Sequence, residues 1–306
     1  MNKGFQIGWW LIIATIASMY LVSLPLAYIY PNMNEYVLSL IGETGIIIPI
    51  LIGLLYSKKC GNSVKDTLGL KKFSPVLIPL CILLVIGAQY FITYVTMPAE
   101  MILIIMFGSE TSTSQMLVPN GIPAFLTAFF VLCVAAPVFE ELLCRGVLIK
   151  LFEKYGFAVS VISSALAFAM LHLELRSFIQ IFFIGLLLGV IRVCSGSAVL
   201  TIIMHSVNNF LSLCQLMFFD VDSPGAEYTI LFFAALLFPA VIYITFVKCA
   251  KYLDYSLVNK TDNQKTGISV AAIISVAGFL GFNLVLFVNR LINGLCSAEL
   301  IGLFKF

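Results

Sequence analysis

Residues 121–150 read GIPAFLTAFFVLCVAAPVFEELLCRGVLIK, and this stretch decides the fold class. It is apolar over almost its whole length and exceeds the roughly 20 residues that cross about 30 Å of hydrocarbon. It nevertheless carries Glu140, Glu141 and Arg145. Such groups cost at least about 2.5 to 3.5 kcal/mol each at bilayer depth, so they indicate a functional site by default. The stretch therefore predicts a transmembrane helix that contributes polar groups to a site inside the membrane.

The composition of the whole chain agrees with a membrane protein. Of its 306 residues, 61% are hydrophobic and 10% are charged, whereas soluble domains average about 45 to 50% and about 25%. The net charge of +2 is carried by residues scattered among predicted loops. A nucleic-acid surface needs a clustered basic patch, so nucleic acid is excluded as a partner. The eight cysteines form no CxxC pair and predict neither disulfides nor a cysteine-bound metal.

Hydrophobic run length predicts an all-α, polytopic transmembrane helical bundle of about nine spans, forming a single membrane domain over residues 1–306. The predicted spans are 7–30, 36–56, 75–96, 121–150, 157–173, 177–193, 198–217, 227–249 and 267–289. Residues 101–107 are apolar but too short to span, so we expect them in the interface, followed by a flexible loop at 110–116 and, after Arg290, a short amphipathic tail.

The distribution of basic residues predicts the orientation. One side of the predicted bundle receives Lys3, Lys58, Lys59, Lys65, Lys71, Lys72, Lys150, Lys154, Arg192, Lys248, Lys251, Lys260 and Lys265. The opposite side receives only Arg176, Arg290 and Lys305. Because short cytoplasmic loops are enriched in Lys and Arg, we expect a multi-pass protein of the cell membrane with a cytoplasmic N-terminus.

The two acidic residues are expected to differ in role. Glu141 and Arg145 are one helical turn apart and can form an ion pair, whereas Glu140 points about 100° away from Glu141 and has no cation in its own helix. Pro137 cannot donate a hydrogen bond to Cys133, so we expect a kink that opens a wet cavity beside Glu140.

Two further pairs with helical spacing lie in apolar spans. Phe168 and His172 are four residues apart, as are His205 and Asn209, and these are the only histidines of the chain. If the three helices converge, Glu140 and His172 can activate a water, while His205 and Asn209 donate to the oxyanion of a tetrahedral intermediate. This constellation predicts a hydrolase of amide bonds at a buried site, in a polar intramembrane cavity.

Other interpretations of these residues stay open. The Glu141–Arg145 pair can be purely structural, and His205 and Asn209 can form hydrogen bonds that only hold helices together. Phe168 can be an ordinary residue of the apolar core. A proton-coupled membrane transporter is the first functional alternative, and a non-enzymatic immunity or scaffold protein is the second. Glu140, His172 and His205 can also supply three zinc ligands, although no HExxH is present and we expect no cofactor.

Helix lengths give a check on whether the groups can meet. Counted from the turn near Tyr155 at about 1.5 Å per residue, Glu140 and His172 both lie about 22 to 26 Å along their helices. His205, counted from about Gly196, lies nearer about 14 Å. The predicted site therefore requires a tilt or a late start of the last of these helices.

Glu140-Glu141-xxx-Arg145, Phe168-xxx-His172 and His205-xxx-Asn209, in this order on neighbouring predicted helices, resemble the three motifs of a known family. It is the CAAX protease and bacteriocin-processing (CPBP, or Abi) family of intramembrane endopeptidases, which includes the Ras-converting CAAX endopeptidases. The resemblance covers a core of about residues 121–213.

The resemblance implies a helical bundle whose cavity is open toward the cytoplasm and sideways to lipid. In it Glu140, backed by Glu141, and His172 would activate water without a metal, although members were long labelled metalloproteases. His205 and Asn209 would stabilise the oxyanion. The expected partners are the lipid bilayer and a membrane-associated or hydrophobic substrate, cleaved in CAAX processing, in bacteriocin or peptide maturation, or in self-immunity.

Overall fold

The computed structural model describes residues 3–107 and 118–218, together with a few positions between 241 and 252. In these residues the only strand-like feature is an isolated antiparallel bridge between Leu70 and Ser197, so the predicted all-α fold class is confirmed. The helices longer than ten residues are α1 (Lys3–Ile29), α3 (Ile47–Lys59), α5 (Leu77–Phe107), α9 (Phe157–Leu171), α10 (Phe178–Ser195) and α11 (Ala198–Phe218). The shorter elements are α2 (Glu35–Thr44), α4 (Val64–Leu68), α6 (Gly121–Phe130), η1 (Val131–Ala135), α7 (Ala136–Glu141), η2 (Leu142–Leu148), α8 (Ile149–Phe152) and η3 (Glu153–Tyr155).

Six helical stretches in the described residues are long and apolar enough to cross a membrane. They are Lys3–Ile29, Glu35–Lys59, Leu77–Leu103, Gly121–Tyr155, Phe178–Ser195 and Ala198–Met217, and the shorter apolar helix α9 is a seventh predicted span. Predicted spans 227–249 and 267–289, the loop at 110–116 and the tail after Arg290 lie outside the described residues, apart from a few helical positions between 241 and 248. The polytopic bundle is thus confirmed, while the total of nine spans stays a prediction.

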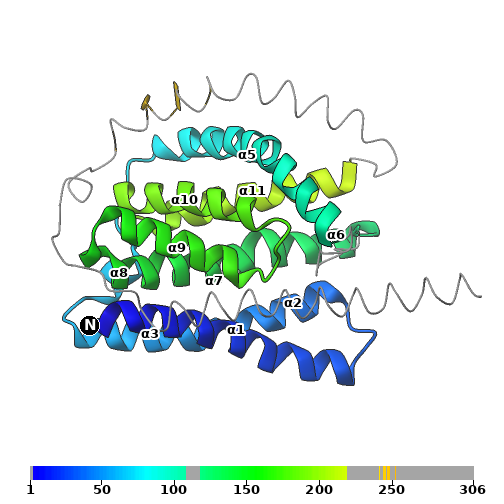
Figure 1. Cartoon of the computed structure of the whole chain (residues 1–306), viewed down its shortest axis with the longest axis horizontal. Helices are drawn as coiled ribbons and strands as arrows, with labels where there is room; N and C mark the ends of the chain where they lie inside the picture. The colour runs from blue at the N-terminus through cyan, green and yellow to red at the C-terminus, as the bar shows by residue number, and fades with distance from the viewer. Residues whose placement is uncertain are drawn as a thin grey trace, which may run out of the picture.

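The helices run roughly along one common direction in layers (Figure 1). Helices α1, α2 and α3 form one side of the bundle, α5 forms the opposite side, and α7 to α11 lie between them. A central apolar cluster joins α1 to the middle layer through Trp9, Ile12, Leu148 and Phe152. A second cluster joins α5 to α10 and α11. The polar residues singled out above therefore lie in the middle layer, covered on both sides.

The predicted span 36–56 is broken in the middle, which the sequence analysis did not foresee. Asn34 caps α2 by accepting hydrogen bonds from the backbone N–H groups of Tyr36 and Val37. The helix ends at Thr44, and the next residue, Gly45, packs so closely on α1 that a Cβ there would lie 2.7 Å from the backbone nitrogen of Met19. The Ser18 hydroxyl also donates to the Gly45 carbonyl at 2.8 Å. The break therefore fixes the last turn of α2 against α1.

Helix α5 is longer than predicted. The expected end at Thr96 and the separate interfacial piece at 101–107 are wrong, since one helix continues from Leu77 to Phe107 and passes through Pro98. A proline inside a helix removes one backbone hydrogen bond. The run is apolar on both sides of Pro98, so packing on α10 and α11 supports the longer helix.

The helix that carries the glutamates departs from α geometry twice. In η1 the N–H of Ala136 donates to the carbonyl of Val131, five residues earlier, and in η2 the N–H of Ile149 donates to Cys144 in the same way. The first π segment lies directly before Pro137, which lacks the N–H that an α-helix would direct at Cys133. Short π segments within helices occur often at functional sites. The local distortion expected at Pro137 thus takes the form of a π turn.

The turn before α11 is buried in the protein. Gly196 adopts a left-handed conformation with φ +71°. The next residue, Ser197, pairs with Leu70, and the N–H of Ala198 donates to the Gly69 carbonyl at 2.8 Å. Ser197 and Ala198 are both fully buried. Helix α11 therefore begins at Ala198, the predicted first residue of this span, with its first turn packed inside the protein.

Candidate active site

Glu141 is neutralised inside the protein. Its Oε1 lies 2.8 Å from Nη1 of Arg145, and both side chains are fully buried. Arg145 also donates to the carbonyl of Gly185 at 3.2 Å, and its guanidinium lies 4.2 Å from the centre of the Phe168 ring. Gly185 allows this approach of α10, because a Cβ there would lie 3.1 Å from the Ala165 backbone. The expected ion pair is present, and three helices converge on it.

Glu140 faces a different space from its neighbour. Its side chain lines a cavity, and its Oε2 atom is buried without a hydrogen-bond partner. The nearest cationic candidate is Nε2 of His205, at 4.0 Å. The different environments of the two glutamates agree with the helical geometry, and they leave Glu140 with a carboxylate free to meet a ligand.

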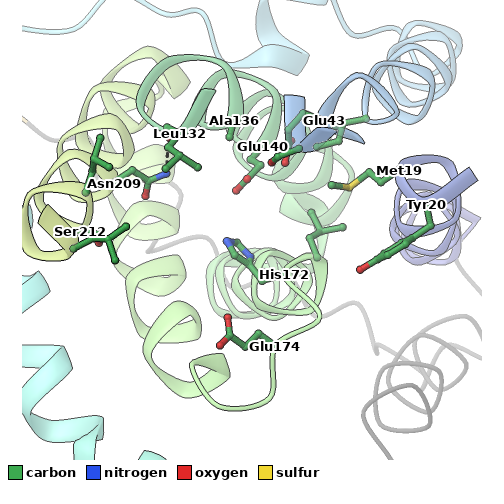
Figure 2. A pocket seen from close by; sticks show the side chains of 15 residues that line it. Met19, Tyr20, Glu43, Leu132, Ala136, Glu140, His172, Glu174, Asn209 and Ser212 are labelled. Carbon is green, nitrogen blue, oxygen red and sulfur yellow. Dashed lines mark hydrogen bonds between the residues drawn. The ribbon is translucent and has the colours of Figure 1, made fainter. Parts of the chain in front are cut away.

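His172 reaches the same cavity from the end of α9. Its Nδ1 lies 2.8 Å from the Phe168 carbonyl. A carbonyl oxygen only accepts, so Nδ1 carries the proton and Nε2 is left as an acceptor in the neutral ring. Figure 2 shows the imidazole pointing into the cavity across from Glu140. Next along the chain, Leu173 has φ 49° at the point where the chain leaves α9.

His205 lies behind the cavity wall. It is 2% exposed and is not among the residues that line the cavity. Its Nδ1 lies 3.2 Å from Oε1 of Glu141, while its Nε2 faces Glu140. The Phe168 ring packs edge to face on both His172 and His205, with centroid distances of 4.9 and 5.3 Å. His205 thus contacts both carboxylates, and Phe168 packs against both histidines and Arg145.

Asn209 lines the cavity one turn beyond His205 on α11. Its Nδ2 donates to the carbonyl of Leu132 at 2.9 Å, within the first π segment. An amide group has two N–H hydrogens, so one remains after this bond. The bond orients the amide and ties α11 to the helix that carries the glutamates.

The cavity has a volume of about 410 Å³ and is formed by α1, α2, α7, α9, α11, η1 and the turn after α9 (Figure 2). Its polar lining residues are Tyr20, Ser39, Glu43, Glu140, His172, Glu174, Asn209 and Ser212. The structure therefore brings Glu140, His172 and Asn209 to one cavity. It places Glu141, Arg145, Phe168 and His205 directly behind that wall.

Glu43 and Glu174 were missed by the sequence analysis. Glu43 stands in the apolar run 36–56, so the criterion that singled out Glu140 applied to it equally. It was overlooked because it has no partner at helical spacing. Glu174 follows α9 in a turn and carried no signal of its own.

The cavity lies away from the N-terminal end of the bundle. The start of α9 is held at that end, because the Phe5 N–H donates to the Tyr155 hydroxyl and their rings pack 5.1 Å apart. Helix α9 runs from there toward His172, so the turn at 172–177 lies at the opposite end. Leu171, His172 and Glu174 all line the cavity. The expectations of a cytoplasmic N-terminus and of a cavity open to the cytoplasm both stay predictions.

The zinc alternative required Glu140, His172 and His205 to form one ligand set. In the described part of the chain, no group of three His, Cys, Asp or Glu side chains is placed to hold a metal ion. His205 directs Nδ1 at Glu141 and lies outside the cavity that His172 lines. The arrangement does not fit a three-ligand site.

Comparison with protein families gives one match. Residues 122–211 match the family described as type II CAAX prenyl endopeptidase Rce1-like. No curated protein and no solved structure matches the chain. The matched segment contains all three motifs, from Glu140 to Asn209, whereas Glu43 lies outside it. The match confirms the predicted resemblance: residues 122–211 are similar to this family of CAAX-type endopeptidases.

Proposed function

We propose that this protein is an intramembrane endopeptidase that cleaves a membrane-associated or hydrophobic peptide or protein, with Glu140 as the general base. The observation that carries the proposal is the placement of Glu140 and His172 on facing walls of one cavity (Figure 2). The proposal gives a purpose to the unpaired carboxylate of Glu140, whose neighbour Glu141 is already neutralised by Arg145.

In the proposed reaction a water molecule lies between Glu140 and His172. The Nε2 lone pair of His172 accepts one hydrogen bond from the water and orients it, while Glu140 removes the other proton. The resulting hydroxide attacks the scissile carbonyl carbon, and the carbonyl oxygen becomes an oxyanion. Glu140 then returns its proton to the leaving amine as the C–N bond breaks.

Asn209 is the donor placed to stabilise the oxyanion. Asn209 lines the cavity, its Nδ2 has a second hydrogen beyond the one bonded to Leu132, and that bond fixes the amide before the reaction begins. His205 contacts the two carboxylates rather than the cavity, so we propose that it positions Glu140 and Glu141. The predicted donation by His205 to the oxyanion would require its ring to move into the cavity.

The test is cleavage of a quenched fluorescent hydrophobic peptide by the purified full-length protein in lipid nanodiscs. Glu140→Gln is expected to lower kcat by at least about 100-fold, as for the loss of a general base. Glu100→Gln is the matched control, because Glu100 is a partly buried carboxylate of α5 that does not line the cavity. Cleavage is expected to persist after treatment with a zinc chelator. Full activity of Glu140→Gln would refute the assignment.

We also propose that the N-terminus is cytoplasmic, so that the cavity opens in the outer half of the membrane. The N-terminal end of the bundle carries nearly all described basic turn residues, including Lys58, Lys59 and Lys154, whereas the opposite end carries Arg176. A membrane-impermeant maleimide applied to intact cells tests this. In a Cys60→Ser background, Asn32→Cys is expected to gain labelling in intact cells. In the protein that retains Cys60, this exposed cysteine is expected to react only after permeabilisation. The opposite pattern would reverse the orientation.

A further inference from the structure

Glu43 is a second unpaired carboxylate in the cavity. It lies in the last turn of α2, is 7% exposed, and its Oε2 atom has no hydrogen-bond partner. It lines the same cavity as Glu140, and Figure 2 shows both side chains directed at the same space. A buried carboxyl group whose oxygen lacks a hydrogen-bond partner is unfavourable, so its presence needs an explanation.

In the part of the chain that the structure describes, Glu43 has no positively charged partner. No ion pair of Glu43 occurs within 4.0 Å among the residues that the structure describes. Arg145 is buried near the active-site glutamates, but it is already paired with Glu141. The lining contains the carboxylates of Glu43, Glu140 and Glu174 and no lysine or arginine. A cationic group of a ligand can therefore supply the positive charge that the lining of the cavity lacks.

The backbone holds Glu43 in this place. The next glycine, Gly45, has no room for a side chain against Met19, and its carbonyl accepts a hydrogen bond from Ser18. The last turn of α2 is thus fixed on α1, which presents the Glu43 side chain to the cavity. A fixed carboxylate in a protected site is a better partner for a cation than a mobile one at the surface, because less conformational entropy is lost on binding.

We propose that Glu43 is a specificity-determining residue that binds a cationic group of the substrate, an arginine or lysine side chain close to the scissile bond. This inference rests on the proposed function and names a feature of its substrate. A guanidinium matches a carboxylate with two parallel hydrogen bonds, so arginine is the better ligand. The same carboxylates repel an acidic side chain or a free C-terminal carboxylate at that position.

The test compares two hydrophobic peptides that differ at one residue, arginine in one and citrulline in the other, with that residue moved stepwise along the peptide. Citrulline keeps the shape of arginine and removes its charge. The wild-type protein in nanodiscs is expected to cleave the arginine peptide with kcat/KM about tenfold higher or more at one position. Glu43→Gln is expected to reduce that preference to about twofold or less, and Glu43→Asp to restore part of it.

Glu174→Gln is the matched control, since it removes a carboxylate from the same cavity at a more exposed position. It is expected to keep the preference for arginine. An equal loss of preference in Glu174→Gln would show that the general negative potential selects the substrate, and would overturn the assignment to Glu43. A fall in cleavage of both peptides by the same factor in Glu43→Gln would also overturn it, because Glu43 would then act through Glu140.

Binding separates this inference from the proposed function. The affinities of the two peptides are measured by fluorescence anisotropy in the Glu140→Gln background, where no cleavage is required. Tighter binding of the arginine peptide, lost on adding Glu43→Gln, supports the inference even if the wild-type protein cleaves neither peptide. Equal affinities in a protein that does cleave would leave the peptidase in place and reject the role of Glu43.

Discussion

Substitution of Arg145 by methionine tests how much the buried Glu141–Arg145 ion pair contributes to the stability of the protein. Arg145 is fully buried and contacts Glu141 at 2.8 Å, the Gly185 carbonyl at 3.2 Å and the Phe168 ring at 4.2 Å. Arg145→Met leaves Glu141 buried with only His205 beside it. Loss of one partner of a buried ion pair costs about 3 to 5 kcal/mol, because the other charge stays buried without compensation.

The double variant Glu141→Gln/Arg145→Met should be much more stable than the sum of the single variants implies. Replacement of both charges removes the uncompensated carboxylate, so the remaining cost is about 1 to 2 kcal/mol, for the hydrogen bond lost at Gly185 and at His205. Either single variant breaks the buried pair at a cost of about 3 to 5 kcal/mol, so the expected coupling energy between Glu141 and Arg145 is at least about 4 kcal/mol.

The assay is reversible unfolding in mixed micelles with increasing SDS, followed by tryptophan fluorescence. Both tryptophans of the chain lie in α1, and Trp9 is buried against Phe152. Lys150→Met is the control, because the Lys150–Glu153 pair is partly exposed and its loss should cost less than about 1 kcal/mol. Additive single-variant effects, or a cost of Arg145→Met equal to that of Lys150→Met, would refute the reasoning.

Two further predictions concern packing and capping. Gly53→Ala should destabilise the protein by about 1 to 3 kcal/mol in the same assay, since its Cβ would lie 2.3 Å from Val147 Cγ1, whereas Gly42→Ala, with no neighbour closer than 3.7 Å, should be tolerated. The Ser63 hydroxyl donates to Asp66 at 2.7 Å and holds the pKa of that carboxyl below its usual range. The stabilisation of α4 by this bond is therefore fully present at pH values above the usual pKa of a carboxyl group, and it is lost as the pH falls through the lowered pKa of Asp66. Amide exchange in α4 should show this loss in the wild type and not in Ser63→Ala.

The spacing of a few polar residues was enough to predict which side chains gather in the middle layer. Helical periodicity placed Glu141 one turn from Arg145 and turned Glu140 to another face, and the structure agrees. The same spacing grouped His205 with Asn209, but it could not show that His205 lies behind the wall of the cavity. Whether a residue on a helix face reaches a cavity depends on the neighbouring helices, which periodicity does not describe.

Glu43 shows the limit of reasoning from motifs. It had no partner at helical spacing, and its place in the cavity is set by the packing of α2 on α1, where Gly45 approaches the backbone of Met19. The buried start of α11 is a similar case, since it depends on pairing of Ser197 with Leu70, which is more than 100 residues away in sequence. Such long-range backbone contacts leave no periodic signal.

The sequence by itself determined that this chain is an all-helical membrane protein, and the energetic cost of its few ionisable groups in apolar helices marked them as a candidate site. The reason is that burial of apolar length and the high cost of charge in lipid act on each segment separately, so they can be inferred from local composition. Only the tertiary structure decided which of those groups share the cavity, that Glu43 joins them, and that the cavity lies away from the N-terminal end. These features follow from the packing of whole helices against one another, in which π turns, a broken helix and a buried turn set the depth of every side chain.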